Sequence, residues 1–111
     1  MYMVIMRIKV PRNRRKDFLD AARMFSGRCR VQPGCLSCRF YQELDNTDTA
    51  ILIQEWDSRT NLNDHMRSNE FRIILSLMEL SSETPKFKLS AVFKTEGLEA
   101  IETARAVEFR V

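Results

Sequence analysis

The chain has a single tryptophan and a single histidine, and the two lie close together in the sequence. Trp56 ends a short apolar segment of strand-like composition, and His65 lies in the helical pattern that follows it. Histidine is the side chain whose unperturbed pKa is nearest neutrality, and an indole ring adds a flat apolar wall with one N–H donor. Because a strand end that faces a helix is where a small α+β domain can open a pocket, we expect any chemistry there.

The three cysteines, Cys29, Cys35 and Cys38, are the other residues with chemical potential. Their odd number fits poorly with a closed set of disulfides. Cys35 and Cys38 fall at the start of an expected strand, where positions three apart point to opposite faces, so the two are not expected to share a metal. A tetrahedral zinc site would also lack a fourth ligand unless His65 came from a distant helix. Reduced structural thiols and no metal are therefore predicted.

Alternating residues predict the strands that hold these side chains. In the first of them, Tyr2 and Val4 alternate with Met3 and Ile5, so both faces of the strand are apolar. An exposed apolar sheet face normally marks an interface. The four predicted strands span residues 2–10, 36–44, 50–56 and 87–93.

Apolar residues at helical spacing predict a helix from about residue 14 to residue 29. The next helix is expected to begin at a cap formed by Asp57 or Ser58. Because the pattern restarts a few residues later, Ser68 or Asn69 is expected to cap a separate helix. The buried stripe of that last helix is predicted to be Phe71, Ile74, Leu75 and Met78.

The order strand, helix, strand, strand, helix, strand is the split βαβ arrangement. It predicts an α+β, ferredoxin-like protomer with a four-stranded antiparallel sheet and the helices on one face. The apolar second face predicts a homodimer in which two such sheets pack together. With 111 residues, the chain suits one domain, expected over residues 1–94. A tail over residues 95–111, with a weak helix at 98–106 and a short strand at 107–111, is expected to reach the partner.

Composition excludes several classes of protein. The net charge of +3 is too small to indicate nucleic acid, and the basic cluster at residues 12–16 has no aromatic residues between its cations. This cluster is expected to be a solvated helix start, with an anion or phosphate site as the alternative. No apolar run approaches the roughly 20 residues of a membrane span. The apolar start of the chain is short and lacks the flanks of a signal peptide, so a cytoplasmic protein is expected.

One segment resembles a known family. Glu55–Ser58, Leu62, His65, Ser68 and Phe71 resemble the antibiotic biosynthesis monooxygenase family and its quinol monooxygenase relatives. Pro33–Cys35, Pro85 and Thr95–Gly97 extend the likeness, which runs from Met3 to about Phe93.

The resemblance implies a dimeric α/β barrel with a pocket between sheet and helices in each protomer. Similar proteins oxidise phenolic, quinol or polyketide-like aromatics with molecular oxygen and use neither metal nor flavin. In this scheme the protein binds and orients an electron-rich substrate and removes a proton from it. No cofactor is therefore expected, and the expected partners are a small aromatic substrate, oxygen and a second copy of the chain.

The resemblance also assigns roles to individual residues. Trp56 and His65 match the catalytic positions, the first as pocket wall and hydrogen-bond donor and the second as general base. Phe71 matches an aromatic residue on the last helix of the domain. Further expected substrate contacts are Tyr41, Arg39, Met6 and Phe25. Core packing is the alternative role for Trp56, His65, Phe71, Met6 and Phe25, and Arg39 can instead pair with Glu43 or Glu55.

Three other functions compete with the monooxygenase. A non-catalytic binding or stress-response module could use the same pocket, because one fold supports many functions. Haem-degrading relatives carry their axial histidine about where Leu75 stands, and His65 lies roughly 15 Å earlier along a continuous helix, so this function is disfavoured. An RNA-binding sheet is disfavoured because the central strands lack the required aromatic and basic residues.

Overall fold

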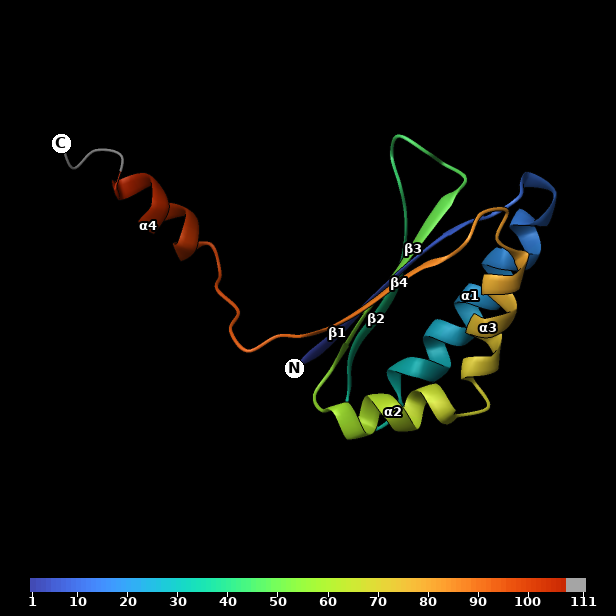
Figure 1. Ribbon diagram of the computed structural model, residues 1–111, viewed down its shortest axis with the longest axis horizontal. Coiled ribbons are helices and arrows are strands. Elements are labelled where there is room, and N and C mark those ends of the chain that lie inside the picture. Colours follow the sequence, from blue (N-terminus) through green and yellow to red (C-terminus); the bar gives the residue numbers. More distant parts are fainter. Residues whose placement is uncertain (108–111) are drawn as a thin grey trace.

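The computed structural model describes residues 1–107 of the chain, and in this part it has the predicted α+β, ferredoxin-like fold (Figure 1). A fourth helix, α4, follows the domain and extends away from it. In chain order the elements are β1 (Tyr2–Lys9), the 3-10 turn η1 (Arg12–Arg14), α1 (Arg15–Arg30), β2 (Cys35–Gln42), β3 (Thr49–Trp56), α2 (Arg59–Arg67), α3 (Phe71–Leu80), β4 (Lys86–Ala91) and α4 (Glu99–Val107).

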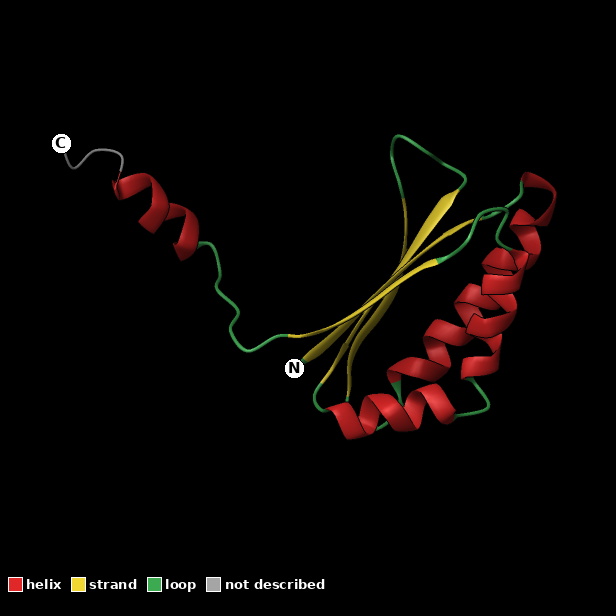
Figure 2. Ribbon diagram, in the orientation of Figure 1, coloured by secondary structure: helices red, strands yellow, loops and turns green. Residues whose placement is uncertain are grey.

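The four strands form one sheet in the order β2-β3-β1-β4, with every neighbouring pair antiparallel. Figure 2 shows α1, α2 and α3 together on one side of this sheet. Since β1 and β3 are the inner strands, the last residue of β3, Trp56, has a partner on each side: Tyr2 on β1 and Cys35 on β2. Trp56 thus lies at the end of the sheet from which the chain continues into α2.

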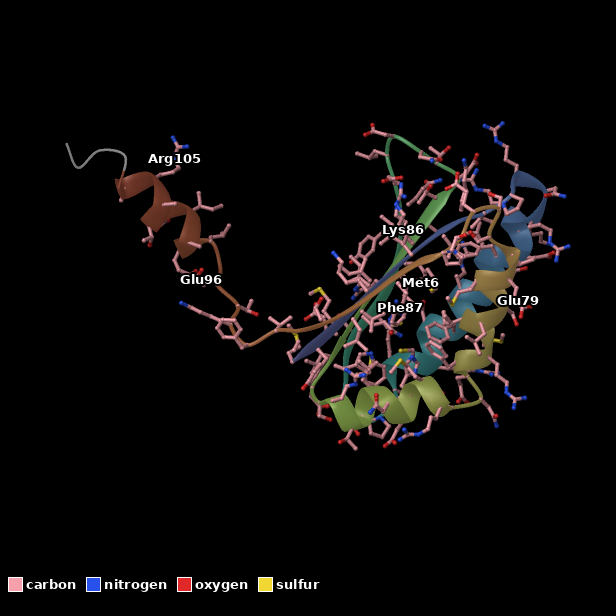
Figure 3. The ribbon with its side chains drawn as sticks, in the orientation of Figure 1. Met6, Glu79, Lys86, Phe87, Glu96 and Arg105 are labelled. Atoms are coloured by element: carbon pink, nitrogen blue, oxygen red, sulfur yellow. The ribbon has the colours of Figure 1, made fainter. Side chains whose placement is uncertain are left out.

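The core lies between the sheet and the helices. On β1, Val4, Met6 and Ile8 point toward the helices and are at most 2% exposed. Figure 3 shows Met6 between the sheet and the helical layer. The predicted stripe of α1 is confirmed, because Phe18, Ala22, Phe25 and Cys29 are all buried.

The prediction for α3 was partly wrong. Its buried residues are Phe71, Ile74 and Leu77, whereas Leu75 is 48% exposed. Positions 71, 74 and 77 lie along one face at a spacing of three, and this face turns Leu75 toward solvent. Leu75 therefore lies outside the core.

Of the two predicted helix caps, the one before α2 is present and the one before α3 is absent. Ser58 caps α2, because its Oγ accepts a hydrogen bond from the Asn61 amide (3.1 Å). The cap predicted for α3 at Ser68 or Asn69 is wrong, since α3 begins after Glu70 without a side-chain cap. Ser68 instead donates its hydroxyl to the His65 carbonyl (2.6 Å) and so satisfies the end of α2.

The start of β2 departs from regular alternation. Cys35 pairs with Trp56 and Cys38 with Gln54, with a bulge at the residue between Cys35 and Ser37. One extra residue inverts the alternation that follows. Cys35 and Cys38 therefore lie on the same, helix-facing side of the sheet, and the prediction that they point to opposite faces was wrong.

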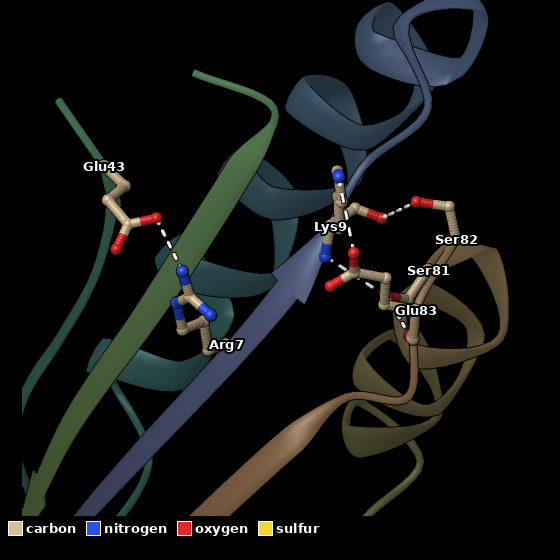
Figure 4. A network of polar contacts seen from close by, with 6 residues as sticks. All are labelled: Arg7, Lys9, Glu43, Ser81, Ser82 and Glu83. Carbon is tan, nitrogen blue, oxygen red and sulfur yellow. Dashed lines mark hydrogen bonds and ion pairs between the residues drawn. The ribbon is translucent and has the colours of Figure 1, made fainter. Parts of the chain in front are cut away.

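The second face of the sheet carries no helix in the described chain (Figure 2). Ile5 pairs with Ile53 at its centre, and both side chains are partly exposed. Arg7 reaches from β1 across β3 to Glu43, with a distance of 2.7 Å between the Arg7 guanidinium and the Glu43 carboxylate (Figure 4). This face is thus apolar at its centre and charged toward one end.

The same close view shows how the chain ties β1 to the segment between α3 and β4 (Figure 4). The Lys9 amide donates to Ser81 Oγ (3.1 Å), and the Ser82 amide donates to the Lys9 carbonyl (2.9 Å). Lys9 Nζ also lies 3.4 Å from the Glu83 carboxylate.

Helix α4 projects away from the sheet and the other helices (Figures 1 and 3). Apolar side chains before and on it are exposed: Phe93 (99%), Leu98 (80%) and Ile101 (57%). The predicted strand at 107–111 falls on residues beyond the described part, except Val107, which ends α4. Within residues 1–107, no helix has the length and apolar character needed to cross a membrane.

Candidate active site

Trp56 and His65 come together because the chain reverses direction at the end of β3. The Asp57 amide donates to the Gly34 carbonyl (2.9 Å), and the Ser58 cap then starts α2 at once. His65, in the second turn of this helix, lies back over Trp56. Their ring centroids are 4.5 Å apart and the ring planes differ by 29°, so the two rings stack.

Two further aromatic rings enclose this pair. The centroid of Phe25 on α1 lies 5.6 Å from that of His65, and the centroid of Phe71 on α3 lies 5.3 Å from it at nearly a right angle. Trp56 is fully buried and His65 is 2% exposed. The structure therefore brings together four of the predicted site residues, Trp56, His65, Phe71 and Phe25, and does so in a closed cluster.

Both ring nitrogens of His65 have a polar partner. Nδ1 lies 2.6 Å from Gln32 Oε1, and Nε2 lies 3.0 Å from Gln54 Nε2. Because an amide oxygen only accepts, Nδ1 carries the proton. Nε2 is then unprotonated, and its lone pair accepts a hydrogen bond from the Gln54 amide. The two glutamines thus fix a single neutral tautomer.

The surroundings also keep His65 uncharged. Burial lowers the pKa of His65 to about 4, against a small opposing effect of the Glu70 carboxylate. A charged imidazolium in this aromatic enclosure would lose its hydration without gaining an anionic partner. His65 is therefore a neutral acceptor at neutral pH.

The indole N–H of Trp56 is a buried donor without a hydrogen-bond partner among the described residues. Most buried polar groups in folded proteins are paired, and an unpaired one costs about 1–3 kcal/mol. One face of the ring is stacked on His65. This unpaired donor is the strongest sign of a site for a polar ligand atom in the cluster.

A thiol cluster lies beside the aromatic one. Gln54 Nε2 is 3.4 Å from Cys29 Sγ and 3.8 Å from Cys38 Sγ, and Cys29 Sγ is 3.8 Å from Cys35 Sγ. All three thiols are free. Contact with Cys38 and burial raise the pKa of Cys29, and burial raises the pKa of Cys35. Among residues 1–107 no three potential ligands gather in a metal-binding arrangement.

The remaining predicted contacts lie elsewhere. Met6 is fully buried in the core of β1. Arg39 is exposed and lies across from Ile53 on the open face of the sheet. Tyr41, 49% exposed, borders a groove of about 610 Å³ between α1 and the edge strand β2. Neither Trp56 nor His65 lines this groove, so the structure separates the predicted residues among the aromatic cluster, the core, the open sheet face and the groove.

Sequence reasoning missed both glutamines. Gln54 had a detectable signal, because it is a polar residue in the buried register of β3 between Leu52 and Trp56, and it is 1% exposed. Gln32 lies in the turn after α1, where periodicity carries no information. The groove that Tyr41 borders was missed as well, because its walls come from segments far apart in the chain.

A split βαβ sheet, a broken second helix and a tryptophan stacked on a histidine define the class: small α+β domains with the ferredoxin-like fold. Residues 1–74 match the model of the family described as "Antibiotic biosynthesis monooxygenase". This match covers well over half of the chain, and the chain belongs to that family.

The sequence identity to an individual relative is low. The chain is 23% identical over 92 residues to the uncharacterised protein sll1783 of Synechocystis, an alignment that covers 82% of this chain and 63% of that protein, so the chain spans under two thirds of the relative's length.

Solved structures share the fold. The crystal structure of an antibiotic biosynthesis monooxygenase superposes with a TM-score of 0.76 and 19% identity, covering 85% of this chain and all of the other. A conserved protein of Methanosarcina mazei gives a TM-score of 0.76 at 22% identity, covering 80% and 89% of the two chains. The protein Rv0793 of Mycobacterium tuberculosis gives 0.77 at 20% identity, covering 86% and 98%.

Proposed function

We propose that this protein is a cofactor-independent monooxygenase that oxidises a phenolic, quinol or polyketide-like aromatic with molecular oxygen. The balance is simple: a hydroquinone and O₂ give a hydroxyquinone and water, so one oxygen atom enters the ring and the other leaves as water. The single observation that carries the proposal is the unpaired indole N–H of Trp56, stacked against a neutral His65 with an unprotonated Nε2. Membership of the family supports it.

In this proposal the two residues divide the work. Trp56 donates its N–H to a substrate oxygen, where negative charge accumulates as the hydroxyl is deprotonated. His65 accepts the proton at Nε2. Because the pKa of His65 is about 4, a strongly acidic hydroxyl suits it best, and a polyketide-like aromatic whose hydroxyl is conjugated with a carbonyl group is more suitable than a simple phenol on this ground. The phenolate then reacts with oxygen among the aromatic rings that enclose His65 and exclude water.

Substrate entry requires a local rearrangement. Gln54 occupies His65 Nε2 in the closed cluster (3.0 Å), so its amide must turn away before a hydroxyl can take its place. The same amide nitrogen already lies 3.4 Å from Cys29 Sγ and 3.8 Å from Cys38 Sγ, so these thiols would remain its neighbours when it leaves His65. Gln54 is thus assigned as a gate for the base.

A second candidate function has its own support. Both nitrogens of His65 are already occupied and its pKa is low, as expected of a structural histidine. A non-catalytic binding or stress-response module with the same fold would show these features without turnover. A homodimer in the cytoplasm is part of both proposals.

Oxygen consumption distinguishes the two. The purified protein is given a panel of hydroquinones and polyhydroxylated naphthalenes, and uptake is compared for the wild type, His65→Gln and Trp56→Phe. Loss of a general base is expected to lower the rate 10²- to 10⁴-fold. Trp56→Phe keeps an aromatic ring and removes only the donor, so a smaller loss, of about tenfold, is expected.

Leu75→Ala, on the exposed side of α3, serves as the matched control and should leave the rate unchanged. Absence of uptake with the whole panel favours the binding module. Uptake that survives His65→Gln would reject His65 as the base.

A further inference from the structure

The groove between α1 and β2 is a second candidate site, distinct from the Trp56 cluster. Its walls are α1, the edge strand β2 and the loop that joins β2 to β3. Thr49, which lines the groove, and Trp56 lie at opposite ends of β3, roughly 20 Å apart along the strand. A volume of about 610 Å³ is in the range of sites for small organic molecules.

The floor of the groove is aromatic. Phe18 on α1 meets Phe40 on β2 edge to face, with ring centroids 5.8 Å apart. Leu19 and Tyr41 border the floor and are 42% and 49% exposed. Apolar surface of this kind, open to solvent inside a concave site, favours a flat apolar ligand.

The walls of the groove are cationic. It is lined by four arginines and a single carboxylate: Arg12, Arg15, Arg23, Arg30 and Asp48. This surplus of three positive charges equals the net charge of the whole chain, +3. Outside the groove, cations and anions are therefore equal in number, and the excess charge of the protein is concentrated here.

Three of these arginines already contact oxygen. Arg12 lies 3.5 Å from Asp48, Arg15 donates to the Thr47 carbonyl (3.0 Å), and Arg30 donates to the Cys38 carbonyl (3.1 Å). Arg23 is exposed and lies on α1 between Arg15 and Arg30. It has no hydrogen-bond or ion-pair partner in the described chain. It follows Arg15 by roughly 12 Å along the helix and precedes Arg30 by roughly 10 Å.

We propose that this groove binds an aromatic carboxylate, with its ring against Phe18 and Phe40 and its carboxylate held by Arg23 in the field of Arg15 and Arg30. The fork of a guanidinium matches a carboxylate with two parallel hydrogen bonds. Inorganic phosphate would leave the aromatic floor unused, and a neutral hydrocarbon would leave the arginines unused. The proposal does not depend on the chemistry at Trp56, since binding here requires no turnover.

Calorimetric titration with 2-naphthoate tests the site on the full-length protein. Saturable binding with one ligand per chain is expected, weakened by added salt because the walls are exposed. Arg23→Gln should raise the dissociation constant about tenfold, whereas the control Arg72→Gln, an exposed arginine on α3 outside the groove, should leave it unchanged. The neutral analogue 2-naphthylmethanol should bind at least tenfold more weakly than 2-naphthoate.

Four results would overturn the proposal. These are the absence of saturable binding up to millimolar ligand, equal affinity for the neutral analogue, equal loss of affinity in Arg23→Gln and Arg72→Gln, and decanoate binding as tightly as 2-naphthoate. The last of these would indicate a fatty-acid groove. If Arg23→Gln changed the mass of the particle in solution and not its affinity, the groove would belong to a contact between copies of the chain.

Discussion

At the scale of single residues, the charge of His65 is coupled to the packing around it. Its ring fills a space between Trp56, Phe25 and Phe71, and its nitrogens are paired with two glutamines. A neutral imidazole satisfies all of these contacts, whereas an imidazolium would face the Gln54 amide donor with a second N–H. We therefore expect protonation of His65 to disrupt the cluster.

This coupling predicts an acid-dependent loss of stability. The pKa of His65 is about 4 in the folded protein against 6.5 for a free histidine, so between these values the unfolded chain binds a proton that the folded one does not. The full stabilisation is present above pH 6.5 and is lost as the pH falls toward 4. The free energy of unfolding should drop by about 3 kcal/mol across this interval from His65 alone.

Urea unfolding of the wild type and His65→Asn at several pH values measures this contribution. The carboxylates titrate in both proteins, so the difference between the two curves isolates the histidine. The difference should narrow by about 1 kcal/mol per pH unit below pH 6. Parallel curves would show that folding does not lower the pKa of His65.

At the scale of elements, the spacing of apolar residues predicted most of the helices and strands. The strands, the break between α2 and α3, and the stripe on α1 all follow from the spacing of apolar residues. The failures have local causes: the bulge between Cys35 and Ser37 inverts the strand alternation, and a shift of the α3 face buries Leu77 and exposes Leu75. Neither an inserted residue in a ladder nor the rotation of a helix about its axis is encoded in a hydrophobic pattern.

The candidate site divides in the same way. Trp56 and His65 could be placed together because a strand end and the next helix are neighbours by topology. The amide of Gln32 and the arginines of the groove could not, since each depends on where a turn or a distant wall falls in three dimensions. Contacts between consecutive elements of the chain were predictable here, and contacts between elements far apart in the chain were not.

The turn between α1 and β2 gives an element-scale prediction. Gly34 has a φ of +84°, and an added Cβ would contact the side chains of Asn61 and Asp57. Gly34→Ala should therefore reduce the free energy of unfolding by about 1–3 kcal/mol. It should also shift α2, because the Gly34 carbonyl anchors the Asp57 amide, and the near-ultraviolet circular dichroism of Trp56 reports that shift.

Gly27 provides the control for this prediction. It lies inside α1, and an added Cβ there meets no atom within 4 Å. Gly27→Ala should raise the free energy of unfolding by about 0.5–1 kcal/mol, since alanine favours the helix. Destabilisation by both substitutions to the same degree would contradict the role assigned to the turn.

At the scale of the whole molecule, one protomer leaves two apolar surfaces uncovered. The first is the centre of the open sheet face around Ile5 and Ile53, and the second is the tail with Phe93, Leu98 and Ile101. Helix α4 has only nine residues, and isolated helices of that length are marginal in water. A second copy of the chain, with its sheet packed against the first and each tail lying on the partner, would cover both surfaces at once.

This arrangement predicts a homodimer at micromolar concentration, measured by sedimentation velocity. Ile53→Asp places a carboxylate at the centre of the open face, where packing of a second sheet would bury it without a partner, and it should yield monomers. Leu75→Asp, which adds the same charge on the exposed side of α3, should remain dimeric. A shortened chain ending at residue 94 should dissociate at higher concentration than the full chain, because it lacks the contacts of α4. If the wild type sediments as a monomer, or if Leu75→Asp dissociates as readily as Ile53→Asp, then the open sheet face does not form the interface.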